Sequence, residues 1–362
     1  MSEIRHNWTK EEILEIYNRP LMGLLYDAAT IHRLHHDPNT VQVSTLLSIK
    51  TGGCPEDCGY CPQAARYHTD IEGNDLMSVQ QVKAQALRAK SSGSSRVCMG
   101  AAWRNVKDGP EFDNVLEMVR TINKLDMEVC CTLGMVTENQ AQRLAEAGLY
   151  AYNHNLDTSE DYYKDVISTR AFEDRLDTIS NVRKTNVTVC SGGIIGMGEA
   201  VEDRAGMLVA LATLDPQPES TPINALVAVP GTPMEEIEPI SIWEMIRMVA
   251  TTRIVMPLTQ VRLSAGRTEM SREGQAMCFF AGANSIFAGD KLLTTPNPDV
   301  NEDMKMFELL GLTPMKPFVK KAQPETVEAV DSQLDALGEK PKWSRPGHKI
   351  ERNEEARVSR TK

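Results

Sequence analysis

The sequence has no apolar run of the roughly 20 residues that a membrane-spanning helix needs, which predicts a protein without a transmembrane segment. Its opening residues, MSEIRHNWTKEE, lack the apolar core of a secretory signal, so we expect a cytoplasmic protein. The sequence also has fewer basic than acidic residues: 39 Lys and Arg against 50 Asp and Glu give a net charge of −11. A body of that sign repels phosphate backbones, which argues against nucleic-acid binding.

The eight cysteines do not suggest disulfides, because a chain without an export signal is expected to keep its thiols reduced. Metal binding or catalysis then has to explain them. Three of them, Cys54, Cys58 and Cys61, lie within eight residues, whereas the others are spread over later segments. The sequence has no second C-x-x-C motif, so the paired motifs typical of structural zinc sites are missing.

The pattern of apolar residues predicts a repeating βα architecture. Residues 1–40 are expected to be helical, with a capping box at Thr9 and Glu12. Strand-like runs follow at 41–50, 95–101, 127–134, 149–157, 187–196, 221–229, 260–266 and 285–290. Helix-like stretches alternate with them at 78–92, 111–125, 137–147, 171–185, 200–214, 241–255, 271–283 and 301–311. Eight strands and eight helices favour an α/β fold of the closed (β/α)8 TIM type over an open sheet.

This pattern divides the chain into four parts. Residues 1–40 form an N-terminal helical segment, 41–315 the barrel and 316–339 a C-terminal extension. Residues 340–362 hold eight Lys and Arg against three Asp and Glu, with little apolar content. Such a segment cannot bury enough apolar surface to fold, so we expect a disordered basic tail.

The segment Cys54-Pro-Glu-Asp-Cys58-Gly-Tyr-Cys61 follows the first predicted strand. Its glycines and prolines predict a loop, and in a barrel this loop lies on the active face. Three soft thiolates suit zinc or an iron–sulfur cluster, and three ligands leave one metal position open for a substrate. A redox pair of Cys58 and Cys61 would leave Cys54 unexplained, and a structural zinc site would need a distant fourth ligand.

Three further cysteines, Cys98, Cys130 and Cys190, fall in the second, third and fifth predicted strands. If Val129 packs against the outer helices, alternation points Cys130 into the barrel and Cys131 away from it. A buried strand cysteine is usually a small apolar side chain, but inward side chains on separate strands converge. We expect Cys278, on a predicted helix, to serve packing alone.

Arg262 places a charge in the middle of the seventh predicted strand, between Val261 and Leu263. Alternation makes this side chain point inward. A guanidinium inside a barrel is costly unless it is paired, so an anionic partner is expected. A second candidate, the triplet of His32, His35 and His36, is read as a solvated helix end.

The spacing C-x-x-x-C-x-x-C, with an aromatic residue before the last cysteine, resembles the signature of the radical S-adenosylmethionine (SAM) superfamily. In that superfamily three cysteines bind a [4Fe–4S] cluster, and SAM chelates the free iron through its amino and carboxylate groups. The resemblance implies that Cys54, Cys58 and Cys61 hold this cluster and that Tyr60 lies against the adenine of SAM. Alternatively, Tyr60 packs as an ordinary aromatic residue on the barrel rim.

Longer segments resemble the biotin synthase family within that superfamily, in the family's order and over roughly residues 10–320. They are Thr51-Gly-Gly-Cys54, Arg-Val-Cys98-Met-Gly-Ala-Ala-Trp, Cys130-Cys-Thr-Leu-Gly, Tyr-Asn-His-Asn-Leu-Asp (152–157), Cys190-Ser-Gly-Gly-Ile-Ile-Gly-Met-Gly-Glu, Pro-Ile-Asn224 and Val-Arg262-Leu-Ser-Ala-Gly-Arg. The resemblance implies a [2Fe–2S] cluster with four ligands: Cys98, Cys130, Cys190 and Arg262.

The same resemblance implies the SAM and substrate contacts. It assigns SAM to Asn155, Asp157, Gly193 and Ile194, with the ribose on the first two. The glycine-rich turn after Cys190 fails the G-x-G-x-x-G pattern because position 201 is Val, and a tight βα turn is its alternative interpretation. Dethiobiotin, the implied substrate, is assigned to four residues, of which the last two are weaker: Asn155, Asn224, Thr294 and Lys50.

The implied activity is sulfur insertion that converts dethiobiotin to biotin, with a flavodoxin- or ferredoxin-type electron donor and a homodimeric assembly. Two alternatives stay open. A lipoyl synthase would need a second cysteine triplet near the N-terminus, and no cysteine precedes Cys54. A non-catalytic zinc or iron–sulfur carrier would bind a cluster without cleaving SAM.

Overall fold

The computed structural model describes residues 4–289, 292–295 and 297–317 of the chain. The C-terminal extension and basic tail expected from the sequence lie outside this range from residue 318 onward. No helix within these described ranges is both long and apolar enough to cross a membrane.

Eight parallel strands close into a barrel, as the repeat of βα units predicts. They are β1 (Thr40–Lys50), β2 (Arg96–Ala101), β3 (Glu128–Thr132), β4 (Ala151–Asn153), β5 (Thr188–Cys190), β7 (Ser220–Ala225), β8 (Gln260–Leu263) and β9 (Ser285–Ala288). The barrel closes because β1 pairs with β2 on one side, where Ser44 faces Arg96, and with β9 on the other, where Gln42 faces Ser285. The (β/α)8 prediction is therefore confirmed.

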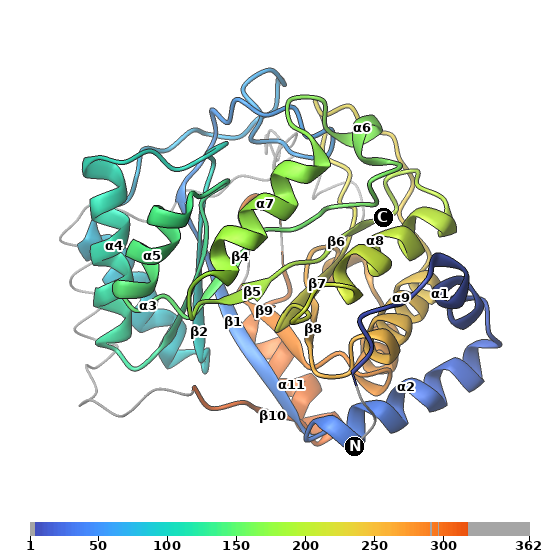
Figure 1. Ribbon diagram of the computed structural model, residues 1–362. Helices are drawn as coiled ribbons and strands as arrows, with labels where there is room; N and C mark the ends of the chain where they lie inside the picture. The colour runs from blue at the N-terminus through green and yellow to red at the C-terminus, as the bar shows by residue number, and fades with distance from the viewer. Residues whose placement is uncertain (1–3, 290–291, 296, 318–362) are drawn as a thin grey trace, which may run out of the picture.

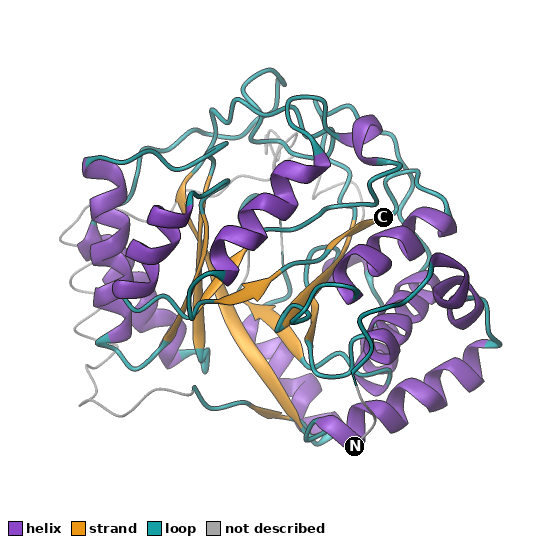
Figure 2. Cartoon of the chain, viewed as in Figure 1, coloured by secondary structure: helices purple, strands orange, loops and turns teal. Residues whose placement is uncertain are grey.

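Helices cover the outside of this barrel (Figures 1 and 2). They are α3 (Val79–Ser91), α4 (Pro110–Asn123), α5 (Glu138–Glu146), α6 (Tyr163–Val166), α7 (Phe172–Arg183), α8 (Val201–Ala212), α9 (Ile242–Val255), α10 (Arg272–Phe280) and α11 (Val300–Leu310). Four of these helices are capped by side chains, because Ser78, Thr137, Ser241 and Ser271 each accept a hydrogen bond from a backbone N–H of the first turn.

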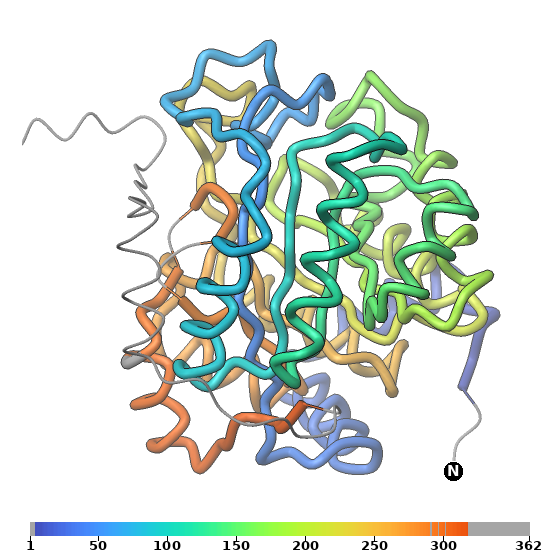
Figure 3. Tube along the Cα trace, turned by 90° about the vertical axis from the view of Figure 1, so that its left-hand side faces the viewer, coloured from blue at the N-terminus to red at the C-terminus, as the bar shows by residue number. Residues whose placement is uncertain are grey.

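The N-terminal segment forms two helices, α1 (Lys10–Tyr17) and α2 (Leu21–His35), and the capping box of Thr9 with Glu12 is present. α1 packs against α8, and α2 packs against α9. Figure 3 shows α2 at one end of the molecule and the long loop between β1 and α3 at the opposite end. The loop that carries the three clustered cysteines thus lies at the end where the barrel strands finish.

His32 corrects one sequence prediction, because it lies in the core rather than at a solvated helix end. Its side chain is 2% exposed, and its ring stacks on that of His36 with the centroids 5.3 Å apart. Burial, with the nearby charge of Arg253, lowers the pKa of His32 to about 3 and that of His36 to about 4. These histidines are therefore neutral packing groups under α9.

The predicted strand at 187–196 is two short strands, β5 and β6 (Gly193–Ile195); β6 pairs with β7, and its Gly193 bridges to Asp157. The break falls at Gly192, where a Cβ atom would lie 2.0 Å from the Pro222 carbonyl oxygen. The backbone therefore approaches β7 too closely for any other residue type. A last short strand, β10 (Thr313–Pro314), pairs with the start of β1.

Candidate active site

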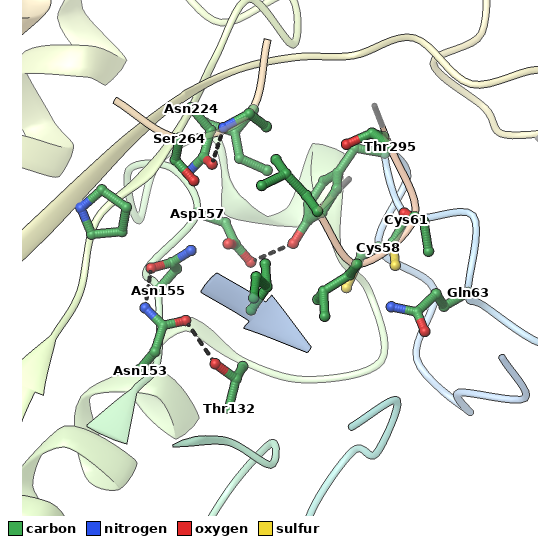
Figure 4. A pocket seen from close by; sticks show the side chains of 18 of the residues that line it. Cys58, Cys61, Gln63, Thr132, Asn153, Asn155, Asp157, Asn224, Ser264 and Thr295 are labelled. Atoms are coloured by element: carbon green, nitrogen blue, oxygen red, sulfur yellow. Dashed lines mark hydrogen bonds between the residues drawn. The ribbon is translucent and has the colours of Figure 1, made fainter. Parts of the chain in front are cut away.

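A cavity of about 310 Å³ opens among the loops that follow the barrel strands, the end where such barrels carry their active sites. Figure 4 shows side chains from several elements pointing into it. Twelve of the residues singled out in the sequence line it: Cys54, Cys58, Tyr60, Cys61, Cys98, Cys130, Asn155, Asp157, Ile194, Asn224, Arg262 and Thr294. The fold therefore brings the cysteine loop, two of the strand cysteines, the polar residues after β4 and Asn224 of β7 to one place.

The loop from Cys54 to Cys61 is held in shape by its own backbone. The Cys54 N–H donates to the Gln63 carbonyl (3.0 Å), and the Cys61 N–H donates to the Cys58 carbonyl (2.9 Å). The Gly59 N–H reaches across to the Val166 carbonyl (2.9 Å), which ties the loop to the end of α6. These bonds present the three thiols to the cavity from one short segment.

Two adjacent acids inside the cysteine loop anchor it to the segment that precedes α7. The Asp57 carboxylate accepts hydrogen bonds from the Ser168 N–H (2.9 Å), from the Thr169 N–H (3.1 Å) and from both hydroxyls. Burial opposes ionisation here, but these hydrogen bonds hold the pKa of Asp57 at about 2. Glu56 accepts from the Thr169 hydroxyl and pairs with Arg104 (3.3 Å).

Sequence reasoning missed this anchor. The signal available was the pair of acids between two cysteines, but their partners lie more than a hundred residues further along the chain. We call the contact of Glu56 and Asp57 with Ser168 and Thr169 the loop clasp.

The three loop thiols fit an iron–sulfur cluster by their chemistry. Burial raises the pKa of Cys58 to about 11, and burial raises the pKa of Cys61 further. Such thiols stay protonated until a metal displaces the proton, which couples binding to proton release. Among the described residues, no group of three His, Cys, Asp or Glu side chains could hold a single metal ion. An iron–sulfur cluster does not require such a group, because each thiolate binds a different iron atom.

Asp157 and Tyr60 form the wall beside the cysteine loop. The Tyr60 hydroxyl donates to Asp157 Oδ2 (2.9 Å), and the Arg175 guanidinium pairs with the same oxygen. The Asp157 backbone has φ of +70°, and its carbonyl accepts from the Ile194 N–H (2.8 Å). A Cβ at Gly193 would lie 2.5 Å from that carbonyl oxygen, so only glycine allows this contact.

A chain of amides continues the wall toward the barrel interior (Figure 4). The Thr132 hydroxyl donates to Asn153 Oδ1 (3.1 Å), and Asn153 Nδ2 donates to Asn155 Oδ1 (3.0 Å). Asn224 Nδ2 donates to the Gly193 carbonyl (2.9 Å), and Asn224 Oδ1 accepts from the Ala265 N–H (3.1 Å). Because each amide is fixed by a partner, its remaining donors and acceptors keep defined directions.

The strand cysteines meet inside the barrel. Cys98 and Cys130 face each other in the register of β2 and β3, and the hydrogen bond from Cys130 holds the pKa of Cys98 below its usual range. Cys190, on β5, is fully buried and accepts from Asn153 Nδ2 (3.3 Å). Cys131 instead packs in the outer core, so the face prediction for β3 is confirmed.

Arg262 points into the barrel, as alternation predicts, and is 1% exposed. Its Nε donates to Ser285 Oγ (2.8 Å) and its Nη2 to Gln42 Oε1 (3.0 Å), while Nη1 lies 3.8 Å from Cys190 Sγ. Within the described residues, neutral oxygens and a thiol take the place of the expected anionic partner. Its guanidinium also stacks 4.7 Å from the centre of the Phe287 ring.

Three of the singled-out residues lie just behind the cavity wall. The Lys50 ammonium donates to the Gly52 carbonyl (3.2 Å) at the start of the cysteine loop. Gly193 supports the wall through its backbone, and Cys190 lies below it against Asn153 and Arg262.

Comparison with known proteins identifies two regions. Residues 48–211 match the model of the radical SAM superfamily, and residues 222–313 match that of the biotin and thiamin synthesis associated domain. The chain is 85% identical over 353 residues to a biotin synthase of Flavobacterium psychrophilum, covering 98% of both chains. It is 58% identical over 316 residues to a biotin synthase of Nostoc punctiforme, covering 86% of this chain and 94% of that one.

Solved structures share the fold at low identity. A methylornithine synthase superposes with a TM-score of 0.70 at 18% identity, covering 89% of this chain and 96% of that one. A maturase of the [FeFe]-hydrogenase superposes with a TM-score of 0.71 at 16% identity, covering 84% and 72%.

Proposed function

The chain belongs to the biotin synthase family of radical SAM enzymes, and on that premise we propose how its residues carry out the conversion of dethiobiotin to biotin. One observation carries the proposal: a single cavity is lined by Cys54, Cys58 and Cys61 from one loop and by Cys98, Cys130 and Arg262 from three strands. The reaction inserts sulfur between two unactivated carbons, whose hydrogens no general base removes usefully. Radical chemistry supplied by a cofactor is therefore required.

Cys54, Cys58 and Cys61 would hold a [4Fe–4S] cluster at the mouth of the barrel. When bound and reduced, this group supplies the electron that cleaves SAM to methionine and a 5′-deoxyadenosyl radical. The chain contributes a loop whose shape is supported by its backbone hydrogen bonds and by the loop clasp. Its three thiols leave one iron free for SAM.

Cys98, Cys130, Cys190 and Arg262 would hold a [2Fe–2S] cluster deeper in the barrel, the group that supplies the sulfur atom. Arg262 is an unusual ligand because guanidinium normally keeps its proton. In this chain Gln42 and Ser285 fix two of its nitrogens, and the Phe287 ring supports its plane. Only Nη1 is left facing Cys190, so the side chain offers one nitrogen in one direction.

SAM and dethiobiotin would lie between the two clusters. The residues proposed for SAM are Tyr60, Asn155, Asp157, Gly193 and Ile194, and those for dethiobiotin are Asn155, Asn224, Thr294 and Lys50. A ribose and a cyclic urea both need donors and acceptors together, which carboxylate and amide side chains provide. The barrel wall then excludes solvent, so that a reactive primary radical meets only its target.

An external one-electron donor of the flavodoxin or ferredoxin type completes the proposal, together with a homodimeric assembly. Sedimentation equilibrium of the anaerobic protein measures the assembly directly.

Anaerobic turnover tests the function. Protein reconstituted with iron and sulfide is mixed with dithionite, SAM and dethiobiotin, and 5′-deoxyadenosine and biotin are quantified by mass spectrometry. Both products are expected, and Cys54→Ala should yield neither because the first cluster loses a ligand. A wild-type protein that binds iron but forms no 5′-deoxyadenosine would be a carrier and would overturn the proposal.

A further inference from the structure

Arg170 follows the loop clasp directly and is a buried cation without adequate partners. Its side chain is 8% exposed and lines the cavity. Its Nε and Nη1 atoms have no hydrogen-bond partner in the described part of the chain. The nearest carboxylate oxygen, Oε1 of Glu56, lies 3.9 Å from Nε, too far for a hydrogen bond.

A buried guanidinium with two unpartnered nitrogens is costly, because these donors lose their hydration and the distant Glu56 carboxylate does not replace it with a hydrogen bond. The cost is recovered if an anion in the cavity accepts from the two free nitrogens. The cavity that Arg170 lines is also lined by Cys54, Cys58 and Cys61. Two unpartnered donors of a buried cation therefore share one cavity with the three loop thiols.

The neighbouring Arg175 does not share this situation. Its nitrogens donate to the Tyr163 hydroxyl (2.8 Å), to the Asn155 carbonyl (2.8 Å) and to the Asp157 carboxylate. Arg175 is therefore committed to the wall behind Asp157. Its positive charge also repels that of Arg170.

The loop clasp fixes where Arg170 lies relative to the thiols. Asp57 binds the N–H groups of Ser168 and Thr169, and Arg104 donates to the Thr169 carbonyl (2.5 Å). The two acids lie between Cys54 and Cys58, so the clasp connects the cysteine loop directly to the segment that carries Arg170.

We propose that Arg170 donates hydrogen bonds from Nε and Nη1 to the sulfur atoms of the four-iron cluster at Cys58, with Asp57 as the residue that positions it. The inference rests on the proposed function. Each reduction adds one electron and one negative charge to the cluster. Hydrogen bonds to its sulfurs and a fixed positive charge stabilise that charge, and so raise the reduction potential.

The test is an EPR-monitored redox titration of the four-iron cluster without SAM, on the full chain. Arg170→Gln should shift the midpoint potential to a more negative value. Arg170→Lys should shift the potential less, because lysine keeps the positive charge but lacks the paired N–H donors of the guanidinium. Lys164→Gln is the matched control: it removes one positive charge from α6, whose end contacts the cysteine loop, but this side chain is exposed and solvent screens it. The iron content of each variant is measured in parallel. If Arg170→Gln binds less iron than the wild-type protein, the midpoint potential of Arg170→Lys is compared with the wild-type value instead.

An unchanged potential in both Arg170 variants would overturn the inference. So would an unchanged potential with a raised dissociation constant for SAM, since Arg170 would then serve the methionine carboxylate. A wild-type chain that binds no four-iron cluster would overturn the proposed function itself, and this outcome is visible before any variant is made. Asp57→Asn should reproduce the direction of the Arg170→Gln shift if the clasp positions the arginine.

Discussion

Cys130 and Cys131 are neighbours in β3, yet one lines the cavity and the other packs under the helices. Their positions follow from strand alternation, a local property that the sequence displays. The partners of Arg262 follow from no local rule, because Gln42 lies 220 residues from it along the chain. At the residue scale, spacing and alternation could therefore predict the thiols, whereas the groups that hold and orient them depend on which strands the closed barrel brings together.

The pair of cysteines in β3 gives a matched test. Cys130→Ala should remove the two-iron cluster and biotin formation while leaving some SAM cleavage, because the loop thiols are untouched. Cys131→Ala should keep both clusters and the activity, since its side chain only packs. Mössbauer spectra and product counts on the two variants measure this, and loss of the two-iron signal in Cys131→Ala instead would reverse the ligand assignment.

At the scale of the element, helices and strands lie close to their predicted positions because caps and apolar periodicity are properties of short segments. Other features escaped prediction, and two of them show why. The break between β5 and β6 is imposed by Pro222, and the burial of His32 is imposed by α9, so both depend on contacts distant in sequence. An element is thus predictable where its own residues determine its structure, and less predictable where contacts with a neighbouring element determine it.

A buried ion pair between Arg267 and Asp303 connects helix α11 to the barrel, and the two side chains are 0% and 1% exposed. Asp303→Ala should lower the free energy of unfolding by about 3–5 kcal/mol, because it leaves the guanidinium buried and unpaired. The adjacent Glu302 is the control, since its pairs with Arg272 and Lys305 are exposed, and Glu302→Ala should change little. Anaerobic urea unfolding compares the two variants, and equal losses would contradict the role given to the buried pair.

At the scale of the whole molecule, the count of eight βα units was enough to predict a closed barrel. How the N-terminal helices dock was not predictable, because it rests on packing of α2 against α9 and on contacts such as that of His36 Nε2 with Arg253 Nη1 (2.9 Å). This docking makes the stability of the molecule depend on pH.

The pKa of His32 is about 3 and that of His36 about 4 in the folded protein, against an ordinary value of 6.5. The unfolded chain therefore binds more protons between these values, so stability is complete above about pH 6.5 and declines as the pH falls toward 4. His36→Gln should make this decline in stability less steep. The difference in stability between the variant and the wild-type protein at pH 8, where the histidine is neutral, measures the effect of the packing change alone. Urea midpoints across the range provide the measurement, and an unaltered slope in the variant would contradict this origin.

The central claim is that one barrel holds two different iron–sulfur clusters on two sets of side chains. Mössbauer spectroscopy with iron and sulfide counts, on protein reconstituted anaerobically with iron-57, tests it most directly. We predict separate [4Fe–4S] and [2Fe–2S] signals, which together require about six irons per chain. A four-iron signal alone would contradict the proposed sulfur donor, and zinc in place of iron would contradict the account as a whole.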